Sequence, residues 1–309
     1  MPPRQRRFSF VQLDVFSHRP LKGNPLAVFT DGRGLTAAAM QALAQEMNLS
    51  ETTFVLPRPA TVERKRGVRV RIFTPQEELP FAGHPTLGTA AVLYAAPPAG
   101  RKPATGTKGP TTIILELGVG PIPVVFHKDS HGKLFGEMRQ RDPEFGALHS
   151  RDEVARVAGI APHDIADDLP IQTVSTGVPF TIVPLKTLDA IGKVRLDFNE
   201  LAEYSKRHDG AFSFYFVTRE TLERNARLHA RMIFSNGEDP ATGSAAGCAA
   251  AWMVRHGVAK PDETALIEQG IEIRRLSRLY VRAGTEDDRV VNVRVGGHVV
   301  EILRGEVRF

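Results

Sequence analysis

The sequence predicts two similar domains, each of which combines strands with helices. The chain has 309 residues, and domains average roughly 150 residues, so two domains are expected. Its composition, 42% hydrophobic and 24% charged, is that of a folded globular protein with a sizeable core. Segments with the apolar pattern of strands recur in both halves, and each half has one Ala-rich helix that follows a glycine. These observations favour an internal duplication.

The first half is predicted to consist mainly of strands. Residues 8–16 form the first strand, because apolar side chains occur on both of its faces. Thr36 is suited to cap a helix that continues to about residue 47, with apolar residues at helical spacing. A second helix, 85–94, is rich in alanine. The other strands expected in this half are 26–29, 52–56, 68–73, 112–117, 121–127 and 134–139.

The second half repeats this arrangement of elements. A short helix is predicted at 151–158, and a second Ala-rich helix is predicted at 244–255. The strands expected around them are 171–175, 180–184, 211–217, 227–234, 272–276, 279–283, 290–295 and 298–303.

The similarity of the two halves extends to single residues. Chance similarity between turn signals is one interpretation, because Gly and Pro are common in such segments. A duplication predicts instead a first domain over 8–140 and a second over 141–309, with a C-terminal strand that could return to the first. Two such domains would face each other across a cleft, where ligand sites are common. A shift of 160 residues places Arg71 on Arg231, Glu78 on Glu238, Pro80 on Pro240 and Gly83 on Gly243.

Composition argues against several kinds of site and partner. The single cysteine, Cys248, cannot form a disulfide framework, a Cys-rich zinc site or an iron–sulfur cluster. The ten histidines lack metal-ligand spacing, and no nucleotide-binding motif is present, so neither a metal nor a cofactor is expected. The net charge of +5 is spread along the chain, which fits a small anionic substrate better than nucleic acid. No apolar segment approaches the roughly 18 residues of a membrane span, and no signal sequence is recognisable, so the cytoplasm is expected.

Both Ala-rich helices begin with a glycine beside small polar residues. The first start is Gly83-His84-Pro85-Thr86, and the second is Thr242-Gly243-Ser244-Ala245. Free backbone N–H groups and the helix dipole favour anions at such a start, and glycine permits a close approach of the ligand. If the two halves face each other, both helix starts could bind one carboxylate-bearing substrate, with the Thr242 and Ser244 hydroxyls adding donors. The substrate-binding residues expected there are Gly83, Thr86, Thr242 and Gly243. A role as helix caps alone is the other interpretation.

Three further residues could move protons. His84 could donate a proton or polarise a substrate, although a structural role is common for a single histidine. Asp239 precedes the second helix and could act as an acid, orient a partner such as His84, or only balance the helix dipole. Glu51 lies among apolar neighbours between a helix and a strand. Desolvation there would suit a general acid/base, whereas a solvated loop glutamate is the alternative.

These residues lie in segments that together resemble the phenazine biosynthesis PhzF-like proteins. The resemblance extends from about residue 10 to the C-terminus, and the combination of segments is what makes it specific. The segments are Gly23-Asn24-Pro25-Leu26-Ala27-Val28, Leu49-Ser50-Glu51-Thr52-Thr53-Phe54, Arg71-Ile72-Phe73-Thr74-Pro75, Leu79-Pro80-Phe81-Ala82-Gly83-His84-Pro85-Thr86-Leu87-Gly88 and Glu238-Asp239-Pro240-Ala241-Thr242-Gly243-Ser244-Ala245-Ala246-Gly247.

The resemblance implies a diaminopimelate-epimerase-like fold of two α+β domains. Each would wrap a curved, mostly antiparallel and barrel-like sheet around a central helix. It also implies a homodimer without metal or organic cofactor, and an isomerase acting on trans-2,3-dihydro-3-hydroxyanthranilate. The site it implies has Glu51 as the proton-transferring group, with His84, Asp239 and Ser244 lining and polarising it and Gly83 and Gly243 beside it. The run Arg274-Arg275-Leu276-Ser277 departs from the family's Gly-Arg-Pro-Ser, which puts the substrate in doubt more than the chemistry.

Three hypotheses about function follow. The first is a cofactor-free isomerase in which Glu51 shifts a proton within a small unsaturated carboxylic acid. The second is an amino-acid epimerase or racemase of the same fold. The two thiols of diaminopimelate epimerases match Ala82 and Thr242 here, so only a Glu51/Asp239 pair could serve such a reaction. The third is a non-catalytic metabolite-binding protein, against which the intact Glu51, His84, Asp239 and Ser244 argue.

Overall fold

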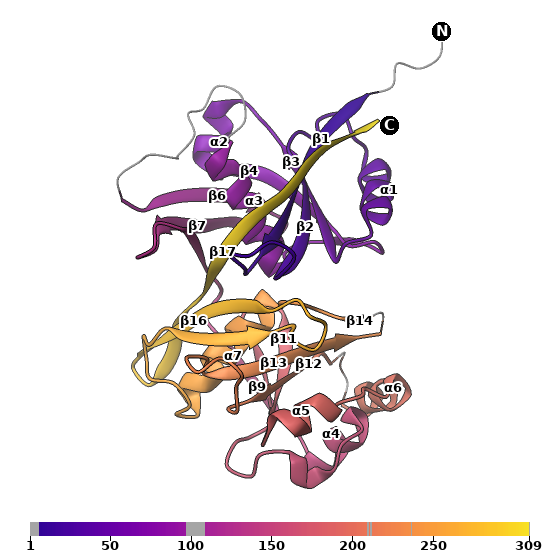
Figure 1. Cartoon of the computed structure of the whole chain (residues 1–309), viewed down its shortest axis with the longest axis vertical. Helices are drawn as coiled ribbons and strands as arrows, with labels where there is room; N and C mark the ends of the chain where they lie inside the picture. Colours follow the sequence, from indigo (N-terminus) through magenta and orange to yellow (C-terminus); the bar gives the residue numbers. More distant parts are fainter. Residues whose placement is uncertain (1–5, 97–108, 209, 211, 236, 309) are drawn as a thin grey trace. The chain divides into compact units, whose positions relative to one another are not determined.

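The computed structural model describes residues 6–96, 109–208, 210, 212–235 and 237–308. The chain divides into two compact units (Figure 1). Unit 1 comprises Met1–Arg139 and Gly296–Phe309, and unit 2 comprises Gln140–Val295. Each unit has its own core, so the fold is built twice from one chain.

The strands of unit 1 close into a barrel. They pair in the order β1–β2–β3–β4–β6–β7–β8–β17 and back to β1. The β2–β3 and β4–β6 pairings are parallel. The bounds are β1 Arg7–Val15, β2 Asn24–Phe29, β3 Glu51–Leu56, β4 Val68–Phe73, β6 Thr111–Leu117, β7 Gly120–Lys128, β8 Leu134–Arg139 and β17 Arg289–Arg308.

Helix α3 (Gly83–Ala95) is the central element of unit 1. It packs against β1, β2, β3, β6, β7 and β8, and its residues from Gly83 to Tyr94 are all buried (Figure 1). A helix that is apolar on every face fits such a position, because no side of it meets water. At Gly88 a Cβ would lie 2.6 Å from Leu26 Cδ2, so glycine lets the strand pack closely against the helix.

Unit 2 repeats this pattern of pairing. Its strands follow the series β9–β10–β11–β12–β13–β15–β16–β17, and the β11–β12 and β13–β15 pairings are parallel, like their counterparts in unit 1. The buried helix α7 (Gly243–Arg255) packs against β10, β11 and β16. The bounds are β9 Glu144–Leu148, β10 Gln172–Ser175, β11 Pro179–Leu185, β12 Phe214–Thr218, β13 Leu228–Phe234, β15 Ala265–Gln269 and β16 Ser277–Glu286.

A duplicated ion pair marks the relationship between the units. Arg71 Nε and a terminal guanidinium nitrogen lie 2.6 and 2.5 Å from the two oxygens of Glu78, on β5 (Glu78–Leu79). Arg231 contacts Glu238, on β14 (Gly237–Glu238), in the same two-point manner at 3.0 and 2.7 Å. Each ion pair links the short strand that precedes a central helix to the longer strand beside it. The predicted pseudo-symmetric α+β fold is confirmed.

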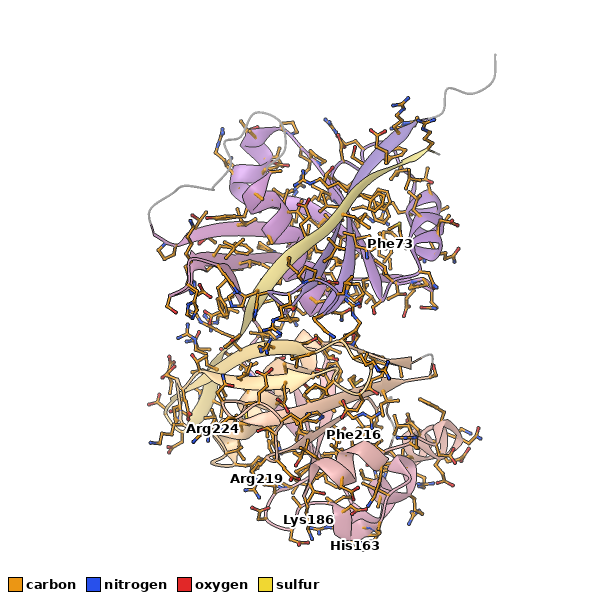
Figure 2. The ribbon with its side chains drawn as sticks, in the orientation of Figure 1. Phe73, His163, Lys186, Phe216, Arg219 and Arg224 are labelled. Carbon is orange, nitrogen blue, oxygen red and sulfur yellow. The ribbon has the colours of Figure 1, made fainter. Side chains whose placement is uncertain are left out.

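Outer helices give each unit a second core. In unit 1, α1 (Ala37–Met47) buries Met40 and Leu43 against aromatic rings that include Phe73 (Figure 2). Thr36 caps α1, as predicted, by accepting a hydrogen bond from Ala39 N. In unit 2, Phe216 belongs to the corresponding cluster (Figure 2). The helices of that cluster are α4 Arg151–Ala158, α5 Leu188–Lys193 and α6 Phe198–Arg207.

Several predicted elements differ from the observed ones. The strand predicted at 272–276 is wrong: Arg274 has φ 61°, and Arg275 N donates to Gly270 O, so the chain turns there. The strand of this region is β15, which was not predicted. The predicted strands 290–295 and 298–303 form one strand, β17. The strand predicted at 211–217 begins at a residue outside the described ones, and β12 starts at Phe214. The short helices α2 (Ala60–Arg66), α5, α6 and the 3₁₀ turn η1 (Pro162–Asp164) were not predicted.

Strand β17 belongs to both units. From Gly296 onward it is part of unit 1, where Val299 pairs with Val15 and Val307 with Phe8. Among the described residues, no helix combines the length and the apolar character that crossing a bilayer requires. α3 and α7 have 13 residues each.

Candidate active site

Unit 1 brings Glu51 and His84 together. Glu51 is the first residue of β3, and His84 is the second residue of α3. His84 Nε2 lies 3.3 Å from Glu51 Oε2, and the two side chains are only 5% and 16% exposed. Parallel pairing sets Glu51 beside Leu26 on β2, so the start of β3 lies near the start of the central helix. A carboxylate and an imidazole that are 33 residues apart in the chain therefore form one site (51 to 84).

His84 is a neutral imidazole at physiological pH. Burial lowers the pKa of His84 to about 3, and a hydrogen bond with the backbone of Pro25 opposes that shift without overcoming it. Asn24, fully buried at the start of β2, places its amide nitrogen 3.2 Å from His84 Nδ1. A neutral imidazole can donate at one nitrogen and accept at the other. The ring can therefore stay uncharged while it donates a hydrogen bond at one nitrogen and accepts one at the other.

The start of α3 has no polar cap. Its N-cap residue, Ala82, has no hydrogen-bonding side chain. The Thr86 hydroxyl donates to Ala82 O at 2.6 Å and is buried, so the predicted substrate contact of Thr86 would need this hydroxyl to leave the helix backbone. Gly83 lies in the first turn, where backbone N–H groups and the helix dipole favour negative charge.

Unit 2 brings Asp239 and Thr242 together. The Thr242 hydroxyl donates to Asp239 Oδ2 at 2.7 Å, and Thr242 is the N-cap residue of α7. Because this hydroxyl bonds to Asp239, it does not cap the helix. Ser244, in the first turn of α7, is partly exposed, whereas Gly243 beside it is buried. The start of α7 thus combines a carboxylate, two hydroxyls and the N–H groups of a helix end.

Three buried residues that sequence reasoning missed support these groups. Gln269, the last residue of β15, bonds to both ends of the Asp239–Thr242 segment, and Tyr215 donates to Gln269 Oε1 at 2.9 Å. Gln140 donates to Gly243 O at 2.9 Å. The signal that could have indicated Gln269 is a pair of polar residues, Glu268 and Gln269, that ends a strand begun by three apolar residues.

The single cysteine is outside this chemistry. Cys248 is fully buried, and its Sγ lies 3.4 Å from Thr176 Oγ1 and 3.6 Å from Val178 O. Burial raises the pKa of the Cys248 thiol to about 11, so it stays protonated at neutral pH. Among the described residues, no group of three or more His, Cys, Asp or Glu is placed to hold a metal ion.

Each unit has a buried central helix with a carboxylate near its start, which makes each of these helix starts a candidate site for proton transfer. The chain matches the family model described as "Phenazine biosynthesis-like protein" over residues 13–305. The chain belongs to this phenazine biosynthesis-like (PhzF) family.

Relatives of the chain are named as isomerases. An uncharacterized isomerase of Mesorhizobium japonicum is 38% identical over 309 residues, covering 97% of this chain and 98% of the relative. A trans-2,3-dihydro-3-hydroxyanthranilate isomerase of Pseudomonas chlororaphis is 34% identical over 302 residues, covering 96% and 98%. The chain is therefore an enzyme of the isomerase class.

Solved structures agree with the fold. A PhzF-family phenazine biosynthesis protein of Bacillus anthracis has a TM-score of 0.85 at 27% identity, covering 98% of this chain and 99% of that one. A hydroxyproline epimerase of Agrobacterium vitis has a TM-score of 0.64 at 12% identity, covering 98% and 93%. The second likeness is one of fold alone, and it confirms the predicted epimerase-like architecture.

Proposed function

We propose that this isomerase shifts a proton within a small unsaturated carboxylic acid resembling dihydro-hydroxyanthranilate, without a cofactor. Glu51 is the general acid/base. The observation that carries the proposal is the 3.3 Å approach of Glu51 to a buried, neutral His84 at the start of a helix. The substrate class is supported by the 34% identity to the trans-2,3-dihydro-3-hydroxyanthranilate isomerase of Pseudomonas chlororaphis.

In the proposed reaction the Glu51 carboxylate takes a proton from a carbon conjugated with the substrate's carboxylate. The electron pair of the broken C–H bond moves into the unsaturated system, and the Glu51 carboxyl returns the proton to another carbon on the same face. The substrate and product therefore have the same composition. Neutral His84 polarises the conjugated system, and the N–H groups at the start of α3 stabilise the developing negative charge.

We propose further that Asp239, Thr242, Gly243 and Ser244 act on the same substrate as Glu51. The support is that the two groups occupy equivalent positions in the duplicated fold, at the start of the central helix of each unit. Ser244 and Gly243 would bind the substrate's carboxylate, and Asp239 would orient the reacting group. We also propose a cytoplasmic homodimer, for which sedimentation equilibrium measures the oligomeric state.

The first test replaces Glu51 by glutamine. General acid–base catalysis contributes about 10²- to 10⁴-fold, so Glu51→Gln is expected to lower kcat by at least about 10²-fold. The assay follows trans-2,3-dihydro-3-hydroxyanthranilate in D₂O by NMR, which reports both turnover and deuterium entering the product. Glu46→Gln makes the same substitution at an exposed position of α1 and should retain full activity.

A double variant tests whether both units serve one reaction. Residues that act as a unit are strongly non-additive. Glu51→Gln combined with Asp239→Asn should therefore be no slower than the slower single variant. Full activity of Glu51→Gln would refute the role of Glu51. A loss in the double variant equal to the product of the two single losses would show that Glu51 and Asp239 act independently. Deuterium exchange in an amino acid together with inversion of its configuration would instead favour the epimerase hypothesis.

A further inference from the structure

We infer that Gln269 is a positioning residue that fixes the direction of the hydrogen bond from Thr242 to Asp239. The inference rests on the proposed function in one respect, namely that Asp239 acts on the substrate. Gln269 and Tyr215 are both fully buried in unit 2. A buried amide destabilises the fold unless its hydrogen-bonding groups find partners, so the partners of Gln269 are informative.

All four hydrogen-bonding positions of the Gln269 amide are used. Oε1 accepts from Thr242 N at 3.1 Å and from the Tyr215 hydroxyl at 2.9 Å. Nε2 donates to Asp239 O at 2.9 Å and to Thr242 Oγ1 at 3.0 Å. A primary amide has two acceptor and two donor positions, so none is left over.

The two backbone groups decide which way the amide faces. A backbone N–H can only donate, so Thr242 N must face Oε1. A backbone carbonyl can only accept, so Asp239 O must face Nε2. Both ends of the Asp239–Thr242 segment are therefore bonded to one side chain whose orientation is unambiguous.

This orientation determines where the Thr242 hydroxyl proton points. The hydroxyl oxygen accepts from Gln269 Nε2, so its own proton is directed at Asp239 Oδ2, 2.7 Å away. The chain of bonds runs from Gln269 through Thr242 to the Asp239 carboxylate. Asp239 is thereby held as a hydrogen-bond acceptor with a fixed rotamer. A carboxylate at Gln269 could not donate to both Thr242 Oγ1 and Asp239 O.

Gly270, the residue after Gln269, lies in close contact with the segment that carries Asp239 and Thr242. Gly270 has φ 77°, and a Cβ at this position would lie 2.6 Å from Pro240 O and 2.7 Å from Arg275 O. Two carbonyls of separate segments thus approach the backbone next to the amide. The backbone that follows β15 therefore packs directly against the segment that carries Asp239.

The test replaces Gln269 by leucine and measures kcat and KM separately. Loss of the amide leaves a buried N–H and a carbonyl unpaired, so kcat is expected to fall on the order of 10- to 100-fold. KM should change much less, because the bonds of the Gln269 amide go to Asp239, Thr242 and Tyr215 and not to Gly243 or Ser244, which would bind the substrate's carboxylate. Gln172→Leu is the matched control: it removes another hydrogen-bonded strand glutamine of unit 2, on β10, and should leave kcat unchanged.

A second readout needs no substrate. Hydrogen exchange of the Thr242 amide should accelerate in Gln269→Leu, while amides of β9 exchange as in the wild type. If Gln269→Leu fails to fold, Tyr215→Phe removes only one bond to Oε1, and a smaller fall in kcat is expected. Thr242→Ser keeps the hydroxyl and is expected to retain kcat, whereas Thr242→Val removes it and is expected to lower kcat.

The outcomes separate this inference from the proposed function. Unchanged kcat and unchanged Thr242 exchange in folded Gln269→Leu would overturn the positioning role. Faster Thr242 exchange without any turnover by the wild type on the substrates tried would support the role of Gln269 and count against the proposed reaction. Equal losses of kcat in Gln269→Leu and Gln172→Leu would show that the loss comes from general destabilisation of unit 2, and would also overturn the inference.

Discussion

At the scale of single residues, the central feature is a neutral histidine beside a glutamate. A carboxylate 3.3 Å from His84 Nε2 favours a protonated ring, whereas burial favours the neutral one. Burial is the larger effect, and it lowers the pKa of His84 to about 3. His84 is therefore able to act as a polar partner of Glu51 across the whole physiological pH range.

The lowered pKa of His84 predicts a loss of stability in acid. Histidine in the unfolded chain has a pKa of about 6.5, so the unfolded state binds a proton between pH 6.5 and 3 that the folded state does not. The contribution of this residue is complete above pH 6.5 and declines by at most about 1.4 kcal/mol per pH unit as the pH falls. Urea unfolding between pH 3.5 and 7 should give a shallower acid dependence for His84→Gln than for the wild type.

A matched control distinguishes burial from a general effect of removing histidine. His163 lies exposed on η1 of unit 2 (Figure 2), and His163→Gln should keep the acid dependence of the wild type. The explanation fails if His84→Gln and the wild type lose stability in parallel.

At the scale of elements, a tight turn places the start of β2, which carries Asn24. Gly23 precedes Asn24 in the connection between β1 and β2 and has φ 74°. A Cβ at Gly23 would lie 2.3 Å from Val15 O, a backbone atom that cannot rotate away. The turn therefore needs glycine for two reasons: its left-handed conformation and the close approach of the neighbouring strand.

Gly23→Ala is expected to destabilise unit 1 by about 3 kcal/mol, the sum of left-handed strain and overpacking. Gly132→Ala separates the two terms, because Gly132 also has φ 74° but would place its Cβ more than 4 Å from other atoms. Its expected loss is about 1 kcal/mol, from strain alone. Equilibrium unfolding in urea measures both. Equal losses in the two variants would show that the contact with Val15 adds nothing.

At the scale of the whole molecule, β17 connects the two units. Its first part follows β16 through the two-residue turn Asp287-Asp288, in which both residues have positive φ. Its later part pairs with β1 and β8 and completes the barrel of unit 1 (Figure 1). The last residues of the chain are thus required by a unit that consists otherwise of the first 139 residues.

Removal of residues 296–309 is expected to unfold unit 1, because β1 and β8 would lose their partner and expose unpaired edges. Size-exclusion chromatography and circular dichroism should show aggregation or a large loss of strand signal. Removal of residues 306–309 leaves the pairings from Val11–Arg304 to Val15–Val299 and should yield a folded protein. A fully folded chain that ends at residue 295 would contradict this account.

Prediction from sequence succeeded where a local pattern carries the information. The central helices were predicted because a glycine followed by an apolar, Ala-rich segment is a strong local signal. It failed at 272–276, where an alternating pattern resembles a strand but Arg275 N closes a turn onto Gly270 O. The conformation of this region is determined by backbone hydrogen bonds between non-adjacent residues, which the pattern of side chains does not reveal.

The site divides in the same way. By itself the sequence determined the duplicated motifs, the candidates Glu51, His84, Asp239 and Ser244, and the exclusion of a two-thiol mechanism. Only the tertiary structure decided which of them touch. The pair Glu51–His84 depends on parallel strand pairing around a buried helix, and Asp239 is held through Gln269, 30 residues further along the chain. Buried polar side chains find their partners across the fold, and their hydrogen bonds leave no periodic trace in the sequence.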